Sequence, residues 1–221
     1  MKTARNTLSL LLLSLTSAHG ALVAGQSIGL DLGTIAPTNH FNALEPAQVF
    51  PSLVISGLVD LTGTPISGVT VKCSNFGNLG AASGPTEAIS PFNDSNTQDW
   101  MGSQGAVTIV ISGLDDALTY DVSIIGHADT WAAGTFYSID GVNSSTITAG
   151  STNSADTLRV FNDVSISGGT LTIMSDTPQV SWGGYFSALV IEAQSAVPEP
   201  GSILLSGIAG IGAMVRRRRL A

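Results

Sequence analysis

Apolar and polar residues alternate with a period of two in several stretches of the chain, and this pattern predicts β-strands. In the stretch 118–124 every second residue is apolar, namely Leu118, Tyr120, Val122 and Ile124. The stretches 107–111 and 189–193 alternate in the same way, and we expect all three apolar faces, Tyr120 included, to lie in the core. No helical spacing of three and four extends over ten residues between the two chain ends. The pattern therefore predicts an all-β fold, an antiparallel β-sandwich.

Five further strands are expected at residues 26–32, 52–61, 68–74, 135–140 and 158–161. Cys73, the single cysteine, alternates with Val69 and Val71 on one strand face. It is therefore expected to be a buried, inert thiol and to form no intramolecular disulfide. Residues 74–106 are rich in Gly, Ser and Asn, with few strand formers, and are expected to form a long loop.

A Gly-Gly dipeptide at 168–169 separates two apolar stretches and predicts a two-residue hairpin. Pairing Ser167 with Thr170 would set Ile166 against Leu171 and continue apolar against apolar along both strands. A slip by one residue would destroy this match, so the register is expected to be well defined.

The C-terminal stretch has an apolar pattern of a different kind. Residues 201–215 are almost uncharged, and a helix of this length spans roughly 22 Å. Because the arginine stems can snorkel and a bilayer can thin locally, this stretch is expected to be a transmembrane helix. Four arginines, Arg216, Arg217, Arg218 and Arg219, follow it and belong on the cytoplasmic side, which places the preceding chain outside. Two prolines precede it in the motif Val197-Pro198-Glu199-Pro200, where the chain cannot be helical throughout.

This order of motif, apolar helix and arginine cluster resembles the PEP-CTERM sorting signal of bacterial exported proteins. The resemblance covers residues 197–221 and implies processing near Pro-Glu-Pro by a membrane-embedded exosortase. The alternative is a plain C-terminal membrane anchor.

The N-terminus has the pattern of a cleavable secretory signal. Lys2 and Arg5 precede the apolar stretch 8–15, and small residues follow at 18–20, which predicts a signal helix over 1–20. Cleavage by signal peptidase is expected before Ala21, with Ala24 or Gly25 as alternative first mature residues. Only two cations, Lys72 and Arg159, remain between residues 21 and 200, against all sixteen acidic residues, so this segment carries a formal charge of −14. Such a charge repels nucleic acid and anionic lipid and is typical of a protein kept soluble outside the cell.

Residues 21–196 are expected to form one domain, since this length suffices for a sizeable core. The order of features from Ile28 to Ala193 resembles galactose-binding-like jelly rolls of bacterial surface proteins and carbohydrate-active enzymes. The resemblance is carried by the short stretches 28–33, 112–114, 118–122, 169–173 and 184–191. It implies a sandwich fold, which carries many functions.

Two groups of residues are candidates for binding. Trp131, with His127 and Asp129 close by, combines an aromatic face with polar groups, a combination that suits a glycan; the alternative is that the tryptophan caps one end of the sandwich. Asp94, Asn96 and Asp99 could share a structural Ca²⁺, although Asp and Asn are also common turn residues and the turn interpretation is favoured.

No metal, phosphate-loop or dinucleotide motif is present, and no histidine is linked in sequence to a nucleophile, so we expect a protein without enzymatic activity or cofactor. The sequence predicts an exported protein, anchored transiently by its C-terminal helix and then displayed on the surface or in the extracellular matrix of a bacterium. There it would serve as a structural component or interact with extracellular polysaccharide. The alternative is a secreted carbohydrate-active hydrolase on a jelly-roll scaffold.

Overall fold

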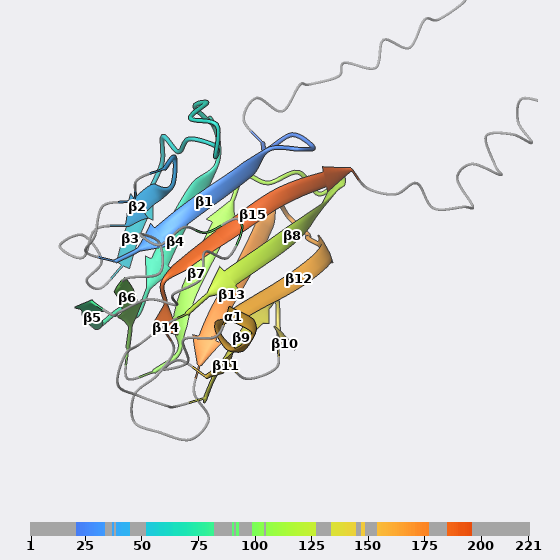
Figure 1. Ribbon diagram of the computed structural model, residues 1–221. Helices are drawn as coiled ribbons and strands as arrows, with labels where there is room; N and C mark the ends of the chain where they lie inside the picture. Colours follow the sequence, from blue (N-terminus) through green and yellow to red (C-terminus); the bar gives the residue numbers. More distant parts are fainter. Residues whose placement is uncertain are drawn as a thin grey trace, which may run out of the picture.

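The computed structural model describes residues 21–33, 37, 39–44, 52–81, 90, 92, 99–103, 105–126, 134–144, 147–148, 154–176 and 185–195. These residues form β-strands and one helical turn (Figure 1). The strands are β1 (Ser27–Leu32), β2 (Asn42–Leu44), β3 (Ser52–Ile55), β4 (Thr70–Ser74), β5 (Asn78–Ala81), β6 (Asp99–Gly102), β7 (Val107–Ser112), β8 (Leu118–Ile125), β9 (Gly134–Ile139), β10 (Val142–Asn143), β11 (Ile147–Thr148), β12 (Leu158–Ser165), β13 (Thr170–Asp176), β14 (Tyr185–Phe186) and β15 (Ala188–Ser195), and the helical turn is α1 (Ser154–Thr157).

Most of these strands belong to two sheets. The first sheet has the order β12-β8-β15-β1-β2, and the second has the order β10-β9-β13-β7-β4-β3, with β11 added to β9. From β7 onward the long strands alternate between the two sheets: β7, β9 and β13 belong to the second, whereas β8, β12 and β15 belong to the first. A small third sheet has the order β14-β6-β5. The expected all-β architecture is confirmed, with strands that are mostly antiparallel.

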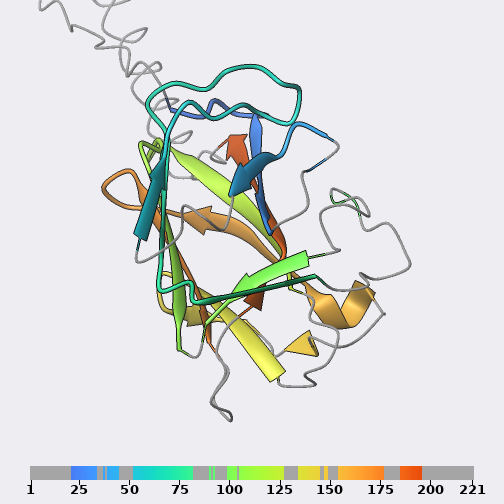
Figure 2. The same cartoon turned by 90° about the vertical axis from the view of Figure 1, so that its left-hand side faces the viewer.

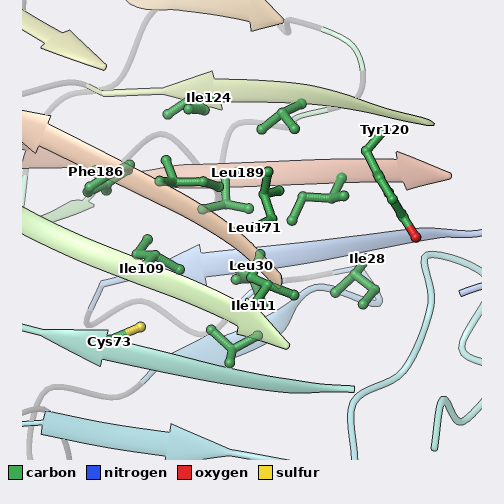
Figure 3. Packing of buried hydrophobic residues seen from close by; sticks show 14 of the residues in the cluster. Ile28, Leu30, Cys73, Ile109, Ile111, Tyr120, Ile124, Leu171, Phe186 and Leu189 are labelled. Atoms are coloured by element: carbon green, nitrogen blue, oxygen red, sulfur yellow. The ribbon is translucent and has the colours of Figure 1, made fainter. Parts of the chain in front are cut away.

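The core lies between the two large sheets, where the alternating faces meet (Figure 3). Tyr120, Val122 and Ile124 are fully buried, as are Ile109 of β7 and Ile191 of β15. The expectations for these faces are confirmed. Strands that bury one face against the facing sheet need apolar side chains at every second position only, which is why the pattern was visible in sequence.

Cys73 is confirmed as a buried thiol. Its side chain has no exposed surface and lies on β4 within the core. Burial raises the pKa of the Cys73 thiol to about 12, because the thiolate would lose its hydration. The thiol therefore stays protonated and unreactive at neutral pH.

The long loop expected at residues 74–106 was wrong in part. It contains β5 and β6, which pair with each other, and β6 also pairs with β14 near the other end of the chain. These strands were missed because Gly and Asn are poor strand formers and both strands are short. The strand expected at 52–61 is also shorter than predicted, since β3 ends at Ile55.

The hairpin expected around Gly168 and Gly169 was wrong beyond its first pair. Ser167 does face Thr170, and both glycines have a positive φ, of 69° and 66°. However, β12 then pairs with β8 in the first sheet, and β13 pairs with β7 and β9 in the second. Ile166 and Leu171 match because both contribute to the core between the sheets and not because they are neighbours along one ladder.

One pair of strands departs from the expected antiparallel arrangement. β2 lies parallel to β1, with Leu30 opposite Asn42. The Asn42 side chain donates to the carbonyl oxygens of Gly29 and Val59, both at 2.9 Å, and accepts from the Val59 amide at 2.9 Å. The amide group of Asn42 thus holds the β3–β4 connection beside β1. Figure 2 shows this connection running across the top of the two layers.

The two ends of the sandwich differ in construction. We call the end where β1 begins and β15 finishes the junction end; Ser195 lies opposite Leu118 there. We call the end where β8 finishes and β15 begins the far end; Ala188 lies opposite Ile125 there. β15 has eight residues, so the two ends lie ~26 Å apart. In Figure 1 the arrowhead of β15 points to the junction end, and β5, β6 and β14 lie toward the other end.

The junction end is closed by tight turns that bind one another. The Asp116 carboxylate accepts from the amides of Gly168 at 3.0 Å and Gly169 at 2.7 Å. The Gly169 carbonyl accepts in turn from the amides of Gly113 at 2.9 Å and Leu114 at 3.1 Å. Gly113 has a φ of +87°, and a Cβ atom there would lie 2.0 Å from the Gly68 carbonyl oxygen, so no other residue fits.

Tyr120 connects this end to the core. Its hydroxyl accepts from the Asp115 amide at 2.9 Å and donates to the Asp115 carbonyl at 3.1 Å, while its ring is fully buried. In Figure 3 the hydroxyl oxygen lies at the end of the cluster, away from the carbons of the other core residues. The side chain therefore fills the core and satisfies two backbone groups of the turn at once.

We expect Tyr120→Ala to lower the free energy of unfolding by ~3 kcal/mol or more, because it removes a buried ring and leaves a cavity. Tyr120→Phe keeps the ring and removes only the hydroxyl, so it should cost about 1–2 kcal/mol. Val54→Ala is the control, since Val54 is 60% exposed on the edge strand β3 and should change little. Urea unfolding measures all three; equal midpoints for Tyr120→Ala and wild type would contradict the placement of Tyr120.

Candidate functional site

Most residues singled out from sequence lie outside the described part of the structure. These are Trp131, His127 and Asp129 of the glycan hypothesis, Asp94 and Asn96 of the calcium hypothesis, and the sorting tail 197–221. Asp99 is the first residue of β6. The signal segment 1–20 and the C-terminal helix also lie outside it, so these expectations stay predictions.

The described part of the chain contains no helix long and apolar enough to cross a membrane. Among its His, Cys, Asp and Glu side chains, no three lie together in a group that could hold a metal ion. The calcium hypothesis therefore stays untested at Asp94 and Asn96.

The small sheet at the far end has one face in the core and one face directed away from it. Met101 of β6 and Phe186 of β14 pair and are both fully buried in the main core. Because side chains alternate along a strand, Trp100 and Tyr185 project from the opposite face. This outward face carries a cluster of aromatic residues that the sequence analysis did not assign to a site.

Trp100 and Tyr185 form an edge-to-face pair. Their ring centroids lie 4.9 Å apart and the ring planes meet at 89°. Tyr185 is only 2% exposed, whereas Trp100 is partly exposed. This geometry is favourable for two aromatic rings, because the positive edge of one meets the negative face of the other.

Tyr137 fixes this pair to the second sheet. Its hydroxyl donates to the Tyr185 carbonyl oxygen at 2.7 Å, and its ring packs against Phe186 with centroids 5.1 Å apart. Tyr137 lies on β9 and is fully buried. The outward pair thus rests on a continuous set of aromatic contacts that reaches the core.

The far end is also where the chain leaves and re-enters the described structure. β8 ends at Ile125 beside Ala188, and the amide of Ser187 donates to the Ile125 carbonyl at 2.9 Å. β9 begins at Gly134, so the segment that holds Trp131 is attached at this end on both sides. The described residues on both sides of that segment, Gly126 and Gly134, therefore lie at the end of the sandwich where Trp100 and Tyr185 pair.

The first and last described residues meet at the junction end. The Gly25 amide donates to the Ala193 carbonyl at 2.7 Å, and the Ala193 amide donates to the Gln26 carbonyl at 2.9 Å. The first described residues and the last ones are therefore neighbours. Both the N-terminal and the C-terminal segments are joined to the domain at this end.

Comparison with known proteins identifies the C-terminal segment. Residues 196–219 match the family model of the PEP-CTERM protein-sorting motif, which confirms the expectation from Val197-Pro198-Glu199-Pro200 and the arginines. The motif implies recognition by an exosortase, export, membrane anchoring by the C-terminal region and surface display.

No curated protein matches the chain. Among solved structures, the YXIM protein of Bacillus subtilis aligns over 78% of this chain and 41% of its own, with 15% identity and a TM-score of 0.44. An exo-β-1,3-galactanase from Phanerochaete chrysosporium, solved with galactose, aligns over 59% of this chain and 35% of its own, with 14% identity and a TM-score of 0.29. Xyl-CBM35, in complex with a disaccharide that contains glucuronic acid, aligns over 56% of this chain and 94% of its own, with 18% identity and a TM-score of 0.28.

The chain thus spans less than half the length of the first two of these proteins. All three TM-scores are below 0.5, so the fold assignment depends on the strand pairing described above.

The buried tyrosines of the sandwich predict a loss of stability at high pH. Burial raises the pKa of Tyr137, and it also raises those of Tyr120 and Tyr185. An unfolded tyrosine ionises near pH ~10, so the unfolded chain loses protons before the folded one. The contribution of these tyrosines to the stability of the folded protein is complete below pH ~10 and decreases as the pH rises above that value.

We expect the free energy of unfolding of the wild-type protein to fall by about 1 kcal/mol between pH 9 and 11 because of Tyr137. In Tyr137→Phe this free energy should fall correspondingly less, because the titrating hydroxyl is absent. Urea unfolding at both pH values gives the difference, and absorbance at 295 nm reports tyrosine ionisation directly. Ionisation of all three tyrosines near pH 10 in the folded protein would refute the burial of Tyr137.

Proposed function

We propose that this protein is exported, sorted by its C-terminal motif and displayed on the surface or in the extracellular matrix of a bacterium, where it is a structural or glycan-interacting component. The observation that carries this proposal is the match of residues 196–219 to the PEP-CTERM sorting motif. Its domain is a jelly roll of the galactose-binding-like type. The alternation of consecutive strands between two sheets supports this assignment.

The route of export begins with cleavage of residues 1–20 by signal peptidase. The apolar segment 201–215 then anchors the chain in the inner membrane, with Arg216 to Arg219 on the cytoplasmic side. An exosortase processes the chain near Pro-Glu-Pro and releases the domain to the surface. The position of Gln26 and Ala193 suits this route, because the first and last described residues lie at one end of the sandwich.

The domain acts without catalysis. The single cysteine is buried and its pKa is raised to about 12, so it is a poor nucleophile. The far end offers aromatic rings that suit contact with a sugar. The alternative function, a carbohydrate-active hydrolase, predicts turnover of polysaccharide or acylated sugar by the purified protein.

The charge of the exported segment limits its partners. The segment 21–200 has a net formal charge of −14 and only two cationic residues, so it repels nucleic acid and anionic membranes. Extracellular polysaccharide is the partner class that fits an acidic surface with a partly exposed indole, that of Trp100. Trp131, with His127 and Asp129, stays our sequence-based candidate for part of this contact.

The sorting proposal predicts a processed C-terminus. In cells that express the full chain with an exosortase, mass spectrometry of the surface protein should find that residues after the Pro-Glu-Pro motif are removed. Replacing Pro198, Glu199 and Pro200 by alanine should block processing and retain the chain in the inner membrane. Deleting Arg216 to Arg219 should weaken orientation and retention there. Surface protein with an intact C-terminus would show that the tail is a plain anchor.

A further inference from the structure

We propose that the outward face of the small sheet is a stacking site for a neutral polysaccharide. We call this face the aromatic platform; its partly exposed ring is Trp100, which lies opposite Gly80, and the buried Tyr185 supports that ring. The inference rests on the proposed function, because it names the partner class and the residues that contact it. It adds a site that lies outside the group around Trp131.

The strand register places glycines opposite both rings. Trp100 of β6 lies opposite Gly80 of β5, and Tyr185 of β14 lies opposite Gly102 of β6. Directly opposite residues share one face of a sheet and normally pack side chain against side chain. Because Gly80 has no side chain, the residue directly opposite Trp100 does not cover the partly exposed indole. Tyr185 is 2% exposed and Gly102 is buried, so the Tyr185 ring supports Trp100 and is not itself a contact surface.

The platform is held rigidly from below. The edge of one ring meets the face of the other at 4.9 Å, and the Tyr137 hydroxyl holds the Tyr185 backbone at 2.7 Å. Met101, between Trp100 and Gly102, is fully buried and fixes β6 to the core. An aromatic side chain that is ordered before binding loses little conformational entropy when a ligand docks on it, which favours affinity.

The chemistry of the platform selects an uncharged ligand with flat apolar faces. A β-linked pyranose has C–H groups on its ring faces, and these stack on an indole through apolar contact. Only Lys72 and Arg159 remain as cations in the exported segment, against sixteen acidic residues. A polysaccharide of uronic acids would therefore be repelled, whereas a neutral one would not.

The location of the platform suits display. Tyr185 immediately precedes β15 at the far end, and the C-terminal segment leaves β15 at the junction end, ~26 Å away. In Figure 1 the labels β14, β6 and β5 mark the platform, at the end of the sandwich remote from the arrowhead of β15. While the chain is attached through its C-terminus, the platform is on the part of the domain remote from the attachment.

The test is a titration of the full chain, in a detergent without a sugar headgroup, with cellohexaose and laminarihexaose. Hexagalacturonic acid serves as the acidic probe of equal length. Binding is followed by calorimetry and by fluorescence of a variant with Trp131→Phe and Trp182→Phe, in which Trp100 is the single remaining tryptophan of three.

We expect one of the neutral hexasaccharides to bind and to change the emission of Trp100. Trp100→Ala should weaken this binding about tenfold or more. Gly80→Val keeps the indole but places a side chain beside it, and should also weaken binding. Val160→Ala, at a 49% exposed apolar position on β12, is the control and should leave binding unchanged. The acidic probe should bind more weakly than the neutral ones.

Thermal unfolding of each variant separates binding from stability. The platform is wrong if Trp100→Ala lowers the melting temperature while affinity is unchanged, because Trp100 would then only cover the sheet. It is equally wrong if Trp131→Ala abolishes binding while Trp100→Ala leaves it unchanged, or if no neutral probe binds. Sorting is read independently from the C-terminal mass of the same variants, so a failure of the platform and a failure of the proposed function give different results.

Discussion

The pairing of β15 between β1 and β8 is the constraint on which the structure depends. Every residue from Ala188 to Ser195 pairs with β8, and the opposite edge of β15 pairs with the first strand of the domain. This arrangement brings both ends of the described chain to one side and directs the connections after β8 and before β15 to the other. The first and last described residues therefore lie at the same end of the sandwich.

How well each strand was predicted from sequence depended on how it buries its side chains. Strands with one buried face, such as β7 and β8, alternate clearly, and their faces were predicted correctly.

Turn chemistry was a weaker guide. Asp140 and Gly141, with φ of 46° and 87°, form a two-residue hairpin between β9 and β10, and this Asp-Gly signal was missed. Gly168 and Gly169 also adopt positive φ, but hydrogen bonds to Asp116 and Gly113 turn the chain from one sheet to the other.

The candidate site was less accessible to sequence analysis because its parts are distant along the chain. Trp100 and Tyr185 are separated by about 85 residues and meet only because β6 pairs with β14. A local signal did exist, since Trp100 and Met101 are adjacent apolar residues within a Gly- and Asn-rich segment, which indicates a short strand with both faces occupied. The sorting motif was recognised readily because it is contiguous, and its physical requirements, a proline break, an apolar helix and a cationic end, are all local.

The central claim is that contact with polysaccharide occurs at the end of the sandwich remote from the sorting tail. Amide chemical shifts of the isotopically labelled protein, recorded with and without the neutral hexasaccharide that binds, test it most directly. The account predicts that shifts change at residues 99–103 and 185–188, whereas residues 113–118 and 168–169 at the junction end stay unchanged. Changes confined to the junction end would contradict it.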